Sequence, residues 1–193
     1  VRYMRKKILF LAGMMACSSL AGAQEISKTW VADKGNGTYQ NPVLHADYSD
    51  PDICAAGDDF YMTASSFNCI PGIPILHSND LVNWSLVNYA LPVQEPEPFF
   101  DKAQHGKGVW APAIRFHNGE FYIYWGDPDY GIYMIKTKDP KGKWSKPVLV
   151  KAGKGMIDAT PLWDEDGKVY LIHAYAGSRS AVSYTHLRAH ETR

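Results

Sequence analysis

The sequence predicts an all-β fold built from repeated four-stranded units, which is the plan of a β-propeller. Three observations support this prediction: short runs of alternating apolar and polar residues, turn residues between the runs, and similar segments that recur along the chain. No window of helical length has a 3.6-residue apolar period. Of the 193 residues, 46% are apolar, which suits a packed core and excludes a disordered chain.

Strands are expected where the alternation is clearest and aromatic and β-branched residues are dense. These runs are residues 60–64, 74–77, 84–87, 121–125, 132–135 and 169–172. Gly57, Asn118-Gly119 and Gly167 stand just before three aromatic-rich runs. Such residues readily adopt the positive φ angles of tight hairpin turns, so each of these three runs is expected to complete a hairpin.

The repeat is visible first in a segment that ends in tryptophan and serine. Residues 77–85 recur as residues 136–145, so that Trp84 and Trp144 stand sixty positions apart. Blades of a propeller stack face to face on apolar and aromatic side chains. We therefore expect both tryptophans to fill the interfaces between blades.

A second series opens each unit. Asp50, Trp110 and Asp158 precede an aromatic strand residue by 11, 12 and 12 positions. Because the innermost strands of a propeller surround a central channel, these three residues are expected to open innermost strands and face one axis. A turn-capping role beside proline is the alternative for Asp50 and Asp158, and their equivalent repeat positions favour the axis.

Both ends of the chain differ from this body. Residues 1–23 hold a basic segment, an apolar run and Ala21-Gly22-Ala23, the three regions of a bacterial signal peptide, so the protein is expected to be secreted or periplasmic. The alternative is an outer-membrane lipoprotein that is acylated at Cys17. No other stretch approaches the ~20 apolar residues of a transmembrane span. Residues 24–180 are then the N-terminal part of the propeller domain, and residues 181–193 are expected to be a non-native tail.

The charge of the body argues against a nucleic-acid partner. The whole chain has 20 basic and 20 acidic residues, whereas residues 24–180 hold 14 and 19. An acidic body has no basic stripe for a phosphate backbone. The histidines of the body form no pair with metal-ligand spacing, and Cys54 and Cys69 are expected to be buried free thiols, so no metal or other cofactor is expected.

Several separated motifs stand in this body in a fixed order. They are Ser49-Asp50-Pro51-Asp52-Ile53, Ser65-Ser66-Phe67 with Pro71-Gly72-Ile73, Asp80-Leu81-Val82-Asn83-Trp84, Gly108-Val109-Trp110-Ala111-Pro112 and Met156-Ile157-Asp158-Ala159-Thr160. Together they resemble the start of glycoside hydrolase family 43, over about residues 40–179. The resemblance implies a five-bladed β-propeller, here truncated to about two and a half blades. It also implies a β-xylosidase or α-L-arabinofuranosidase that acts on hemicellulose polysaccharides or oligosaccharides of the plant cell wall.

The resemblance also implies roles for four residues. Inverting hydrolysis needs one carboxylate that activates water and one carboxylic acid that protonates the leaving oxygen. By resemblance, Asp50 is the general base, and Asp158 is the carboxylate that raises the pKa of the acid and orients it. Phe67 and Trp110 match positions that wall the first sugar site, where aromatic faces suit the apolar face of a sugar.

One part of the family pattern is missing. The family's general acid is a glutamate in a Glu-Gly motif, and no such motif occurs in this sequence. The chain as given is therefore expected to be inactive or nearly so. The alternative function is a non-catalytic carbohydrate-binding propeller, which would keep Phe67 and Trp110 without carboxylates on the axis; Asp50 and Asp158 favour the enzyme. The start motif of a five-bladed fructan hydrolase, with Asn just before Asp-Pro-Asn, is absent.

Overall fold

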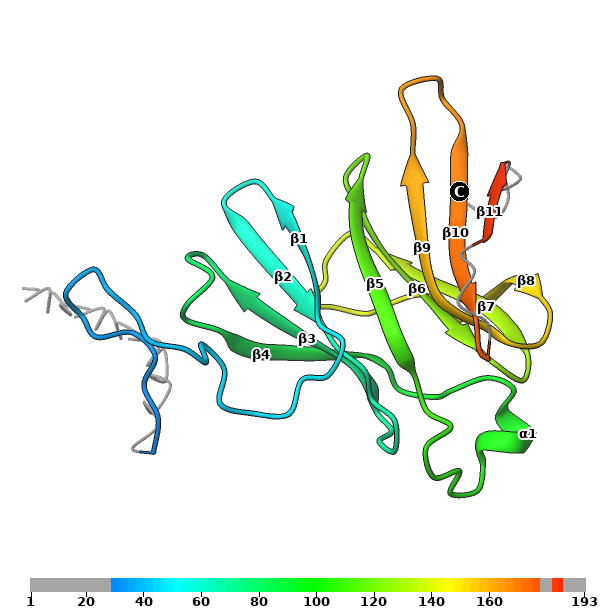
Figure 1. Cartoon of the computed structure of the whole chain (residues 1–193), viewed down its shortest axis with the longest axis horizontal. Helices are drawn as coiled ribbons and strands as arrows, with labels where there is room; N and C mark the ends of the chain where they lie inside the picture. Colours follow the sequence, from blue (N-terminus) through cyan, green and yellow to red (C-terminus); the bar gives the residue numbers. More distant parts are fainter. Residues whose placement is uncertain (1–28, 178–181, 186–193) are drawn as a thin grey trace, which may run out of the picture. The chain divides into compact units, whose positions relative to one another are not determined.

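Three antiparallel sheets, each made of consecutive strands, follow one another along the chain in the computed structural model, which describes residues 29–177 and 182–185 (Figure 1). The first sheet contains β1 (Asp52–Ala56), β2 (Asp59–Thr63), β3 (Gly72–Ser78) and β4 (Ser85–Leu91). The second contains β5 (Trp110–His117), β6 (Glu120–Asp127), β7 (Gly131–Thr137) and β8 (Val148–Ala152). The third contains β9 (Met156–Trp163), β10 (Val169–Tyr175) and β11 (Val182–Thr185), and the single-turn helix α1 (Glu97–Phe100) joins the first two sheets. The predicted all-β class and the partial propeller of about two and a half blades are confirmed.

Some of the predicted segments fall partly or wholly outside the described residues. The predicted signal peptide, residues 1–23 with Cys17, lies outside them. Of the predicted tail, residues 181–193, the structure describes residues 182–185, which form β11 and pair with β10. Within the described residues, no helix has the length and apolar character that crossing a membrane requires.

The three predicted hairpins form where the turn residues stand. β1 and β2 are joined through Gly57 (φ 65°), β5 and β6 through Asn118 (φ 49°) and Gly119 (φ 78°), and β9 and β10 through Gly167 (φ 78°). These positive φ angles are those that glycine and asparagine tolerate most easily. Local turn chemistry therefore determines where the first strand of each blade returns as the second.

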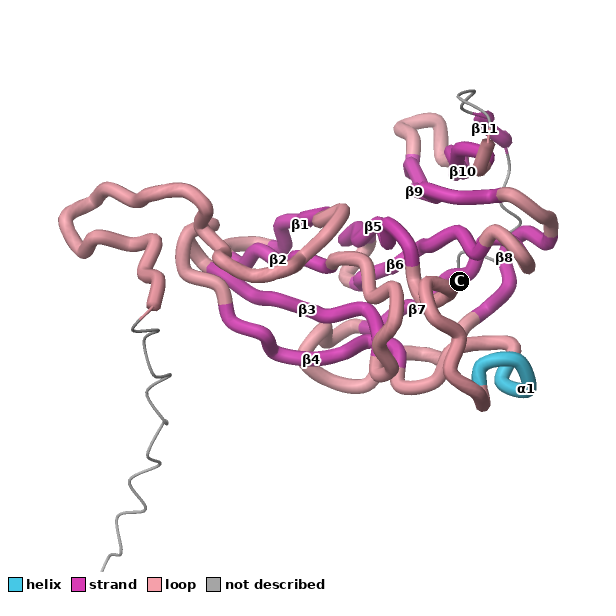
Figure 2. The backbone as a smooth tube through the Cα atoms, turned by 60° about the horizontal axis from the view of Figure 1, so that its bottom comes forward, coloured by secondary structure: helices cyan, strands magenta, loops and turns pink. Residues whose placement is uncertain are grey.

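The second sheet is buried on both faces, because it lies between the first and the third (Figure 2). Side chains alternate along β6: Phe121, Ile123 and Trp125 belong to a core shared with the first sheet, whereas Tyr122 and Tyr124 belong to a core shared with the third. A strand buried on both faces reads as a continuous apolar run rather than as an alternation. The aromatic character of β6 is thus explained by its central position.

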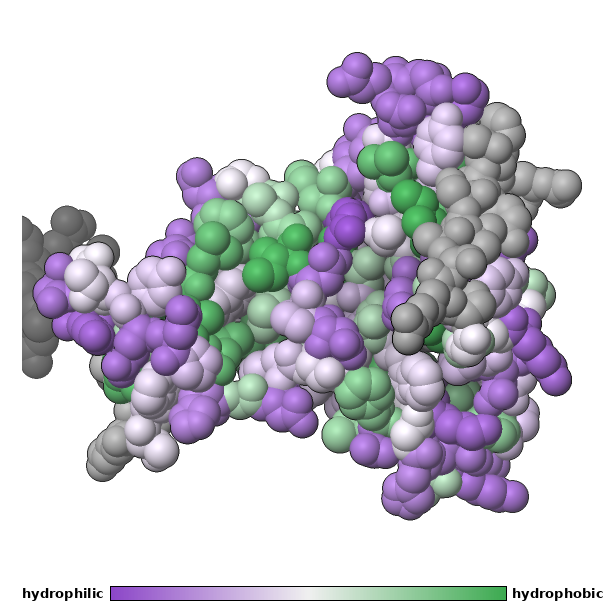
Figure 3. Space-filling model, in the orientation of Figure 1, coloured by the Kyte–Doolittle hydropathy of each residue, from purple (hydrophilic) through white to green (hydrophobic). Residues whose placement is uncertain are grey.

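The two predicted interface tryptophans differ in their surroundings. Trp144 is only 6% exposed and packs in the core between the first two sheets, as expected. Trp84 instead lines a groove of about 720 Å³ on the outer face of the first sheet, together with Leu44, Tyr48 and Ile53. Figure 3 shows hydrophobic residues gathered over β1 and β2. Cys54 and Cys69 are free thiols, as expected, but Cys54 is only half-buried and Cys69 is exposed, whereas the sequence predicts burial of both.

Candidate active site

The innermost strands of the three sheets, β1, β5 and β9, lie next to one another with β5 in the middle (Figure 1). The backbone N–H of Ile114 in β5 donates to the Asp52 carboxylate of β1 at 2.8 Å. On the other side, the Arg115 guanidinium donates to Thr160 Oγ1 of β9, also at 2.8 Å. Residues that open these strands are thereby held close together.

Three of these opening residues share an unusual backbone conformation. Asp50, Ala111 and Asp158 have φ angles of 49°, 35° and 54°, a region that non-glycine residues rarely adopt and that is enriched at functional sites. The backbone therefore aligns Ala111, rather than Trp110, with the two aspartates. Cys54, Arg115 and Leu162 pair with Tyr61, Tyr122 and Tyr170, and Asp50, Ala111 and Asp158 each stand four positions before these partners. The physical reason for this correction is the longer β9–β10 turn: paired Leu162 and Tyr170 stand eight positions apart, against seven for Arg115 and Tyr122, so equal spacing from the tyrosine does not mean an equal place in the strand.

Asp50 is solvent-exposed, and hydroxyl groups orient its carboxylate. The hydroxyls of Ser65 and Ser49 donate to Asp50 Oδ2 at 2.7 and 3.1 Å. Ser65 Oγ in turn accepts the backbone N–H of Ala111 at 2.8 Å. Ser65 thus connects the opening residue of the second blade to the carboxylate of the first. Ser65 is not predicted as a site residue from the sequence, although its position two residues before Phe67 in the Ser65-Ser66-Phe67 motif is a signal that points to it.

Asp158 lies close enough to Asp50 for their charges to interact. Asp158 is an exposed residue of β9, and its pKa is raised above its usual value, first by desolvation from the surrounding protein atoms and second by the negative charge of Asp50. Two carboxylates that share a site disfavour each other's ionisation. The structure therefore brings these two predicted site residues together at the end of the innermost strands.

Phe67 and Trp110 form an aromatic pair beside this position. Their ring centroids are 6.3 Å apart in an edge-to-face arrangement, and Trp110 Nε1 donates to the carbonyl of Gly106 at 2.8 Å. The Gly108 N–H donates to the Phe67 carbonyl at 2.8 Å. A Cβ at Gly108 would lie 2.2 Å from the Ser66 carbonyl oxygen, so glycine permits this close approach of the two loops. Contacts between the loop that holds Phe67 and the start of β5 therefore keep both predicted sugar-binding aromatics close together.

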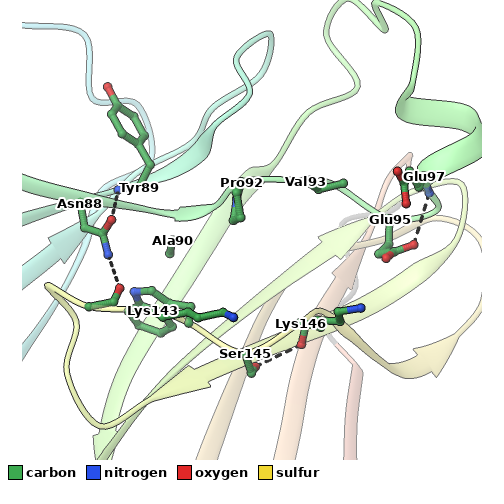
Figure 4. Close-up of a pocket in the computed structure, with 12 residues that line it drawn as sticks. Asn88, Tyr89, Ala90, Pro92, Val93, Glu95, Glu97, Lys143, Ser145 and Lys146 are labelled. Atoms are coloured by element: carbon green, nitrogen blue, oxygen red, sulfur yellow. Dashed lines mark hydrogen bonds between the residues drawn. The ribbon is translucent and has the colours of Figure 1, made fainter.

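The four glutamates that the structure describes have other surroundings. Glu120 accepts hydrogen bonds from Lys136 and the Tyr122 hydroxyl, both at 3.0 Å, and the Lys136 bond is the main cause that lowers the Glu120 pKa. Glu165 lies exposed in the β9–β10 turn. Glu95 and Glu97 line a separate pocket of about 370 Å³ together with Lys143 and Lys146 (Figure 4). None of these four is a partner of Asp50 or Asp158 in the hydrogen bonds described.

Interacting carboxylates beside an aromatic pair, at the inner strands of a propeller, provide the acidic groups and apolar walls that a glycoside-cleaving enzyme uses. The sequence model described as Glycosyl hydrolases family 43 matches residues 39–193. This chain therefore belongs to glycosyl hydrolases family 43.

Related proteins of known sequence and structure agree with this assignment. A β-xylosidase from Formosa agariphila is 36% identical over 193 residues, covering 92% of this chain and 32% of the relative. A non-reducing end α-L-arabinofuranosidase from Bacteroides ovatus is 38% identical over 139 residues, covering 70% of this chain and 26% of the relative.

Among solved structures, a xylan β-1,4-xylosidase from Bacillus halodurans superposes with a TM-score of 0.66 at 26% identity, over 79% of this chain and 31% of that one. A family 43 protein from the xyloglucan utilisation locus of Bacteroides ovatus superposes with a TM-score of 0.64 at 32% identity, over 75% and 29%. The chain thus spans about a quarter to a third of the length of the relatives it matches.

Proposed function

We propose that the protein to which this chain belongs is a secreted bacterial glycosidase that releases xylosyl or arabinofuranosyl units from hemicellulose by inverting hydrolysis. Family membership supports the reaction class, and the names of the β-xylosidase and α-L-arabinofuranosidase relatives support the two sugars. One observation carries the proposal: Asp50, two residues before β1, and Asp158, within β9, adopt the same rare backbone conformation and interact electrostatically.

In the proposed reaction, Asp50 is the general base. Its carboxylate takes a proton from a water molecule whose oxygen bonds to the anomeric carbon, while the glycosidic bond on the opposite face breaks. Ser65 orients the Asp50 carboxylate toward that water. Phe67 and Trp110 provide the wall on which the apolar face of the sugar packs.

The leaving oxygen must receive a proton from a carboxylic acid. Glu120 is paired with Lys136, Glu95 and Glu97 line a separate pocket, and Glu165 lies exposed in the β9–β10 turn, so we place this acid outside the described residues. Asp158, whose carboxyl lies beside Asp50, is proposed to orient that acid and raise its pKa by the proximity of like charges. The chain as given is accordingly proposed to be inactive or nearly so.

The test compares the full-length protein with the 193-residue chain on nitrophenyl β-xyloside and nitrophenyl α-L-arabinofuranoside. The full-length protein should hydrolyse at least one substrate, and proton NMR should show that the product first appears with inverted anomeric configuration. Asp50→Asn should lower kcat by about 10²–10⁴-fold, the usual contribution of a general base. Asp47→Asn, at a nearby exposed aspartate, is the matched control and should leave kcat unchanged.

The other outcomes separate the alternatives. Retention of configuration, or turnover that Asp50→Asn does not affect, would contradict the roles proposed here. A full-length protein that binds xylo-oligosaccharides without cleaving them would instead establish the non-catalytic carbohydrate-binding function. Hydrolysis by the 193-residue chain itself would show that its own residues supply the acid.

A further inference from the structure

Arg115 lies on the middle innermost strand, β5, and bonds to both neighbouring strands. Its Nη1 pairs with Asp52 Oδ2 on β1, and its Nη2 donates to Thr160 Oγ1 on β9 at 2.8 Å. The same Asp52 oxygen accepts the Ile114 N–H, and Nη1 also donates to the Ile114 carbonyl at 2.7 Å. One guanidinium therefore links strands from three different blades.

The two anchors of this link stand at matched positions relative to the candidate site. Asp52 follows Asp50 by two residues, and Thr160 follows Asp158 by two residues. Over two residues a strand extends only about 6.5 Å, so the place of each anchor limits the place of the aspartate before it. Arginine presents its donors in a planar fork of fixed geometry, which makes it a better spacer than the flexible ammonium of lysine.

The link is partly shielded from solvent, and the thiol beside it is uncharged. The Arg115 and Asp52 side chains are 35% and 31% exposed, so solvent screens their pairing only in part. The neighbouring Cys54 thiol has its pKa raised to about 12, first by burial and then by the Asp52 charge, with Arg115 opposing. The thiol is therefore neutral, and the link consists of one cation, one anion and the Thr160 hydroxyl.

We propose that Arg115 is a positioning residue that sets the separation between the Asp50 and Asp158 carboxyl groups. Its importance for catalysis rests on the proposed function, because inverting hydrolysis needs a defined space between the acid and base groups for water. The geometric claim is independent of turnover. The distance between two charges determines how strongly one affects the ionisation of the other. A change in the distance between the Asp50 and Asp158 carboxyl groups can therefore be measured as a change in the effect of Asp50 on the pKa of Asp158.

The experiment follows the titration of the Asp158 carboxyl by carbon-13 NMR in the 193-residue chain. The coupling is the decrease in the Asp158 pKa that Asp50→Asn causes. We expect a clear decrease in the unmodified chain and a smaller one when Thr160→Val or Arg115→Gln is also present. The direct effect of the Arg115 charge on the Asp158 pKa is the same with and without Asp50→Asn, so it cancels when the two pKa values are subtracted. Thr160→Val keeps the shape of the side chain and the Arg115 charge while it removes the bond to β9.

Two controls separate positioning from stability. Lys136→Met breaks the similarly shielded Lys136–Glu120 pair within the second sheet and should lower stability without changing the coupling. Arg115→Lys keeps the charge but not the fork, and it should resemble Arg115→Gln.

The opposite results overturn the proposal. If Thr160→Val and Arg115→Gln behave like Lys136→Met, Arg115 is only a structural link. If Arg115→Lys retains the full coupling, charge and not geometry is responsible. If Asp50→Asn leaves the Asp158 titration unchanged in the parent chain, the two carboxyl groups are not coupled. None of these measurements involves hydrolysis, so they distinguish failure of this proposal from failure of the proposed function.

Discussion

At the scale of single residues, local surroundings decide the ionisation of each aspartate. Asp127 is 4% exposed at the end of β6, and burial raises its pKa although its Oδ1 accepts the N–H groups of Asp129 and Tyr130 at 2.9 and 3.2 Å. Asp80 is exposed, and hydrogen bonds from Asn83 are the main causes that lower its pKa to about 2. Desolvation prevails in the first case and hydrogen bonding in the second.

This difference predicts that Asp127→Asn stabilises the protein at neutral pH. Asparagine keeps an oxygen that can accept the two N–H groups and removes a buried charge. The folded-state pKa of Asp127 is raised, so the buried charge destabilises the protein only where Asp127 is ionised. This destabilisation is absent below the unfolded-state pKa of about 4 and grows as the pH rises from there through the folded-state pKa. Urea denaturation should therefore show a gain in stability near pH 7 that vanishes in acid.

The matched control is Asp129→Asn, which removes an exposed partner of Lys107 and should change stability little. A gain for Asp127→Asn that persists undiminished below pH 4 would contradict the assignment to charge burial.

At the scale of elements, close contacts between strands of neighbouring sheets determine the position of β9. β6 and β9 approach each other closely at Gly126, where a Cβ would lie 2.5 Å from the Met156 carbonyl oxygen and 2.6 Å from Ile157 Cα. We predict that Gly126→Ala forces β9 away from β6, because backbone atoms cannot rotate aside, and that stability falls by about 1–3 kcal/mol. Asp158 follows Ile157, so its carboxyl NMR signal and titration should also shift.

Gly119→Ala is the control for this change. Gly119 lies in the β5–β6 turn with φ 78°, and a Cβ there would meet nothing within 4 Å. The variant should lose about 1–2 kcal/mol through backbone strain alone and leave the Asp158 signal in place. If both variants leave that signal unmoved, β9 does not depend on this contact.

The sequence was informative about elements whose determinants are local and less so about those set by neighbours. The three hairpins could be predicted because Gly57, Asn118-Gly119 and Gly167 supply the turn conformations themselves. The sequence does not predict β8, because only Val150 among its five residues is buried and no alternation is visible.

The candidate site also has features with local determinants, which the sequence indicates, and features set by neighbouring strands, which it does not. Asp50 and Asp158 could be chosen as candidates from repeat positions and resemblance, whereas the alignment of Ala111, rather than Trp110, with them depends on how each innermost strand pairs with the next strand. The link through Arg115 was not predictable, because its partners lie 63 and 45 positions away on other blades.

At the scale of the whole molecule, the second blade joins the two cores. Ile123 and Ile132 are fully buried, the first in the core shared with the first sheet and the second in the core shared with the third. Since β6 and β7 contribute to both cores, loss of either core removes the packing of the central blade. The three sheets should therefore unfold together.

We accordingly predict that Ile123→Val and Ile132→Val each lower the free energy of unfolding by about 0.5–1.5 kcal/mol, although they lie in different cores. Leu162→Ala, at a side chain 51% exposed on the third sheet, should change it by only about 0.5 kcal/mol. Denaturation followed by tryptophan fluorescence and by circular dichroism should give one coincident transition in the parent and in every variant. Separate transitions, or a variant that affects only one probe, would show that each core unfolds by itself and that the central blade does not couple them.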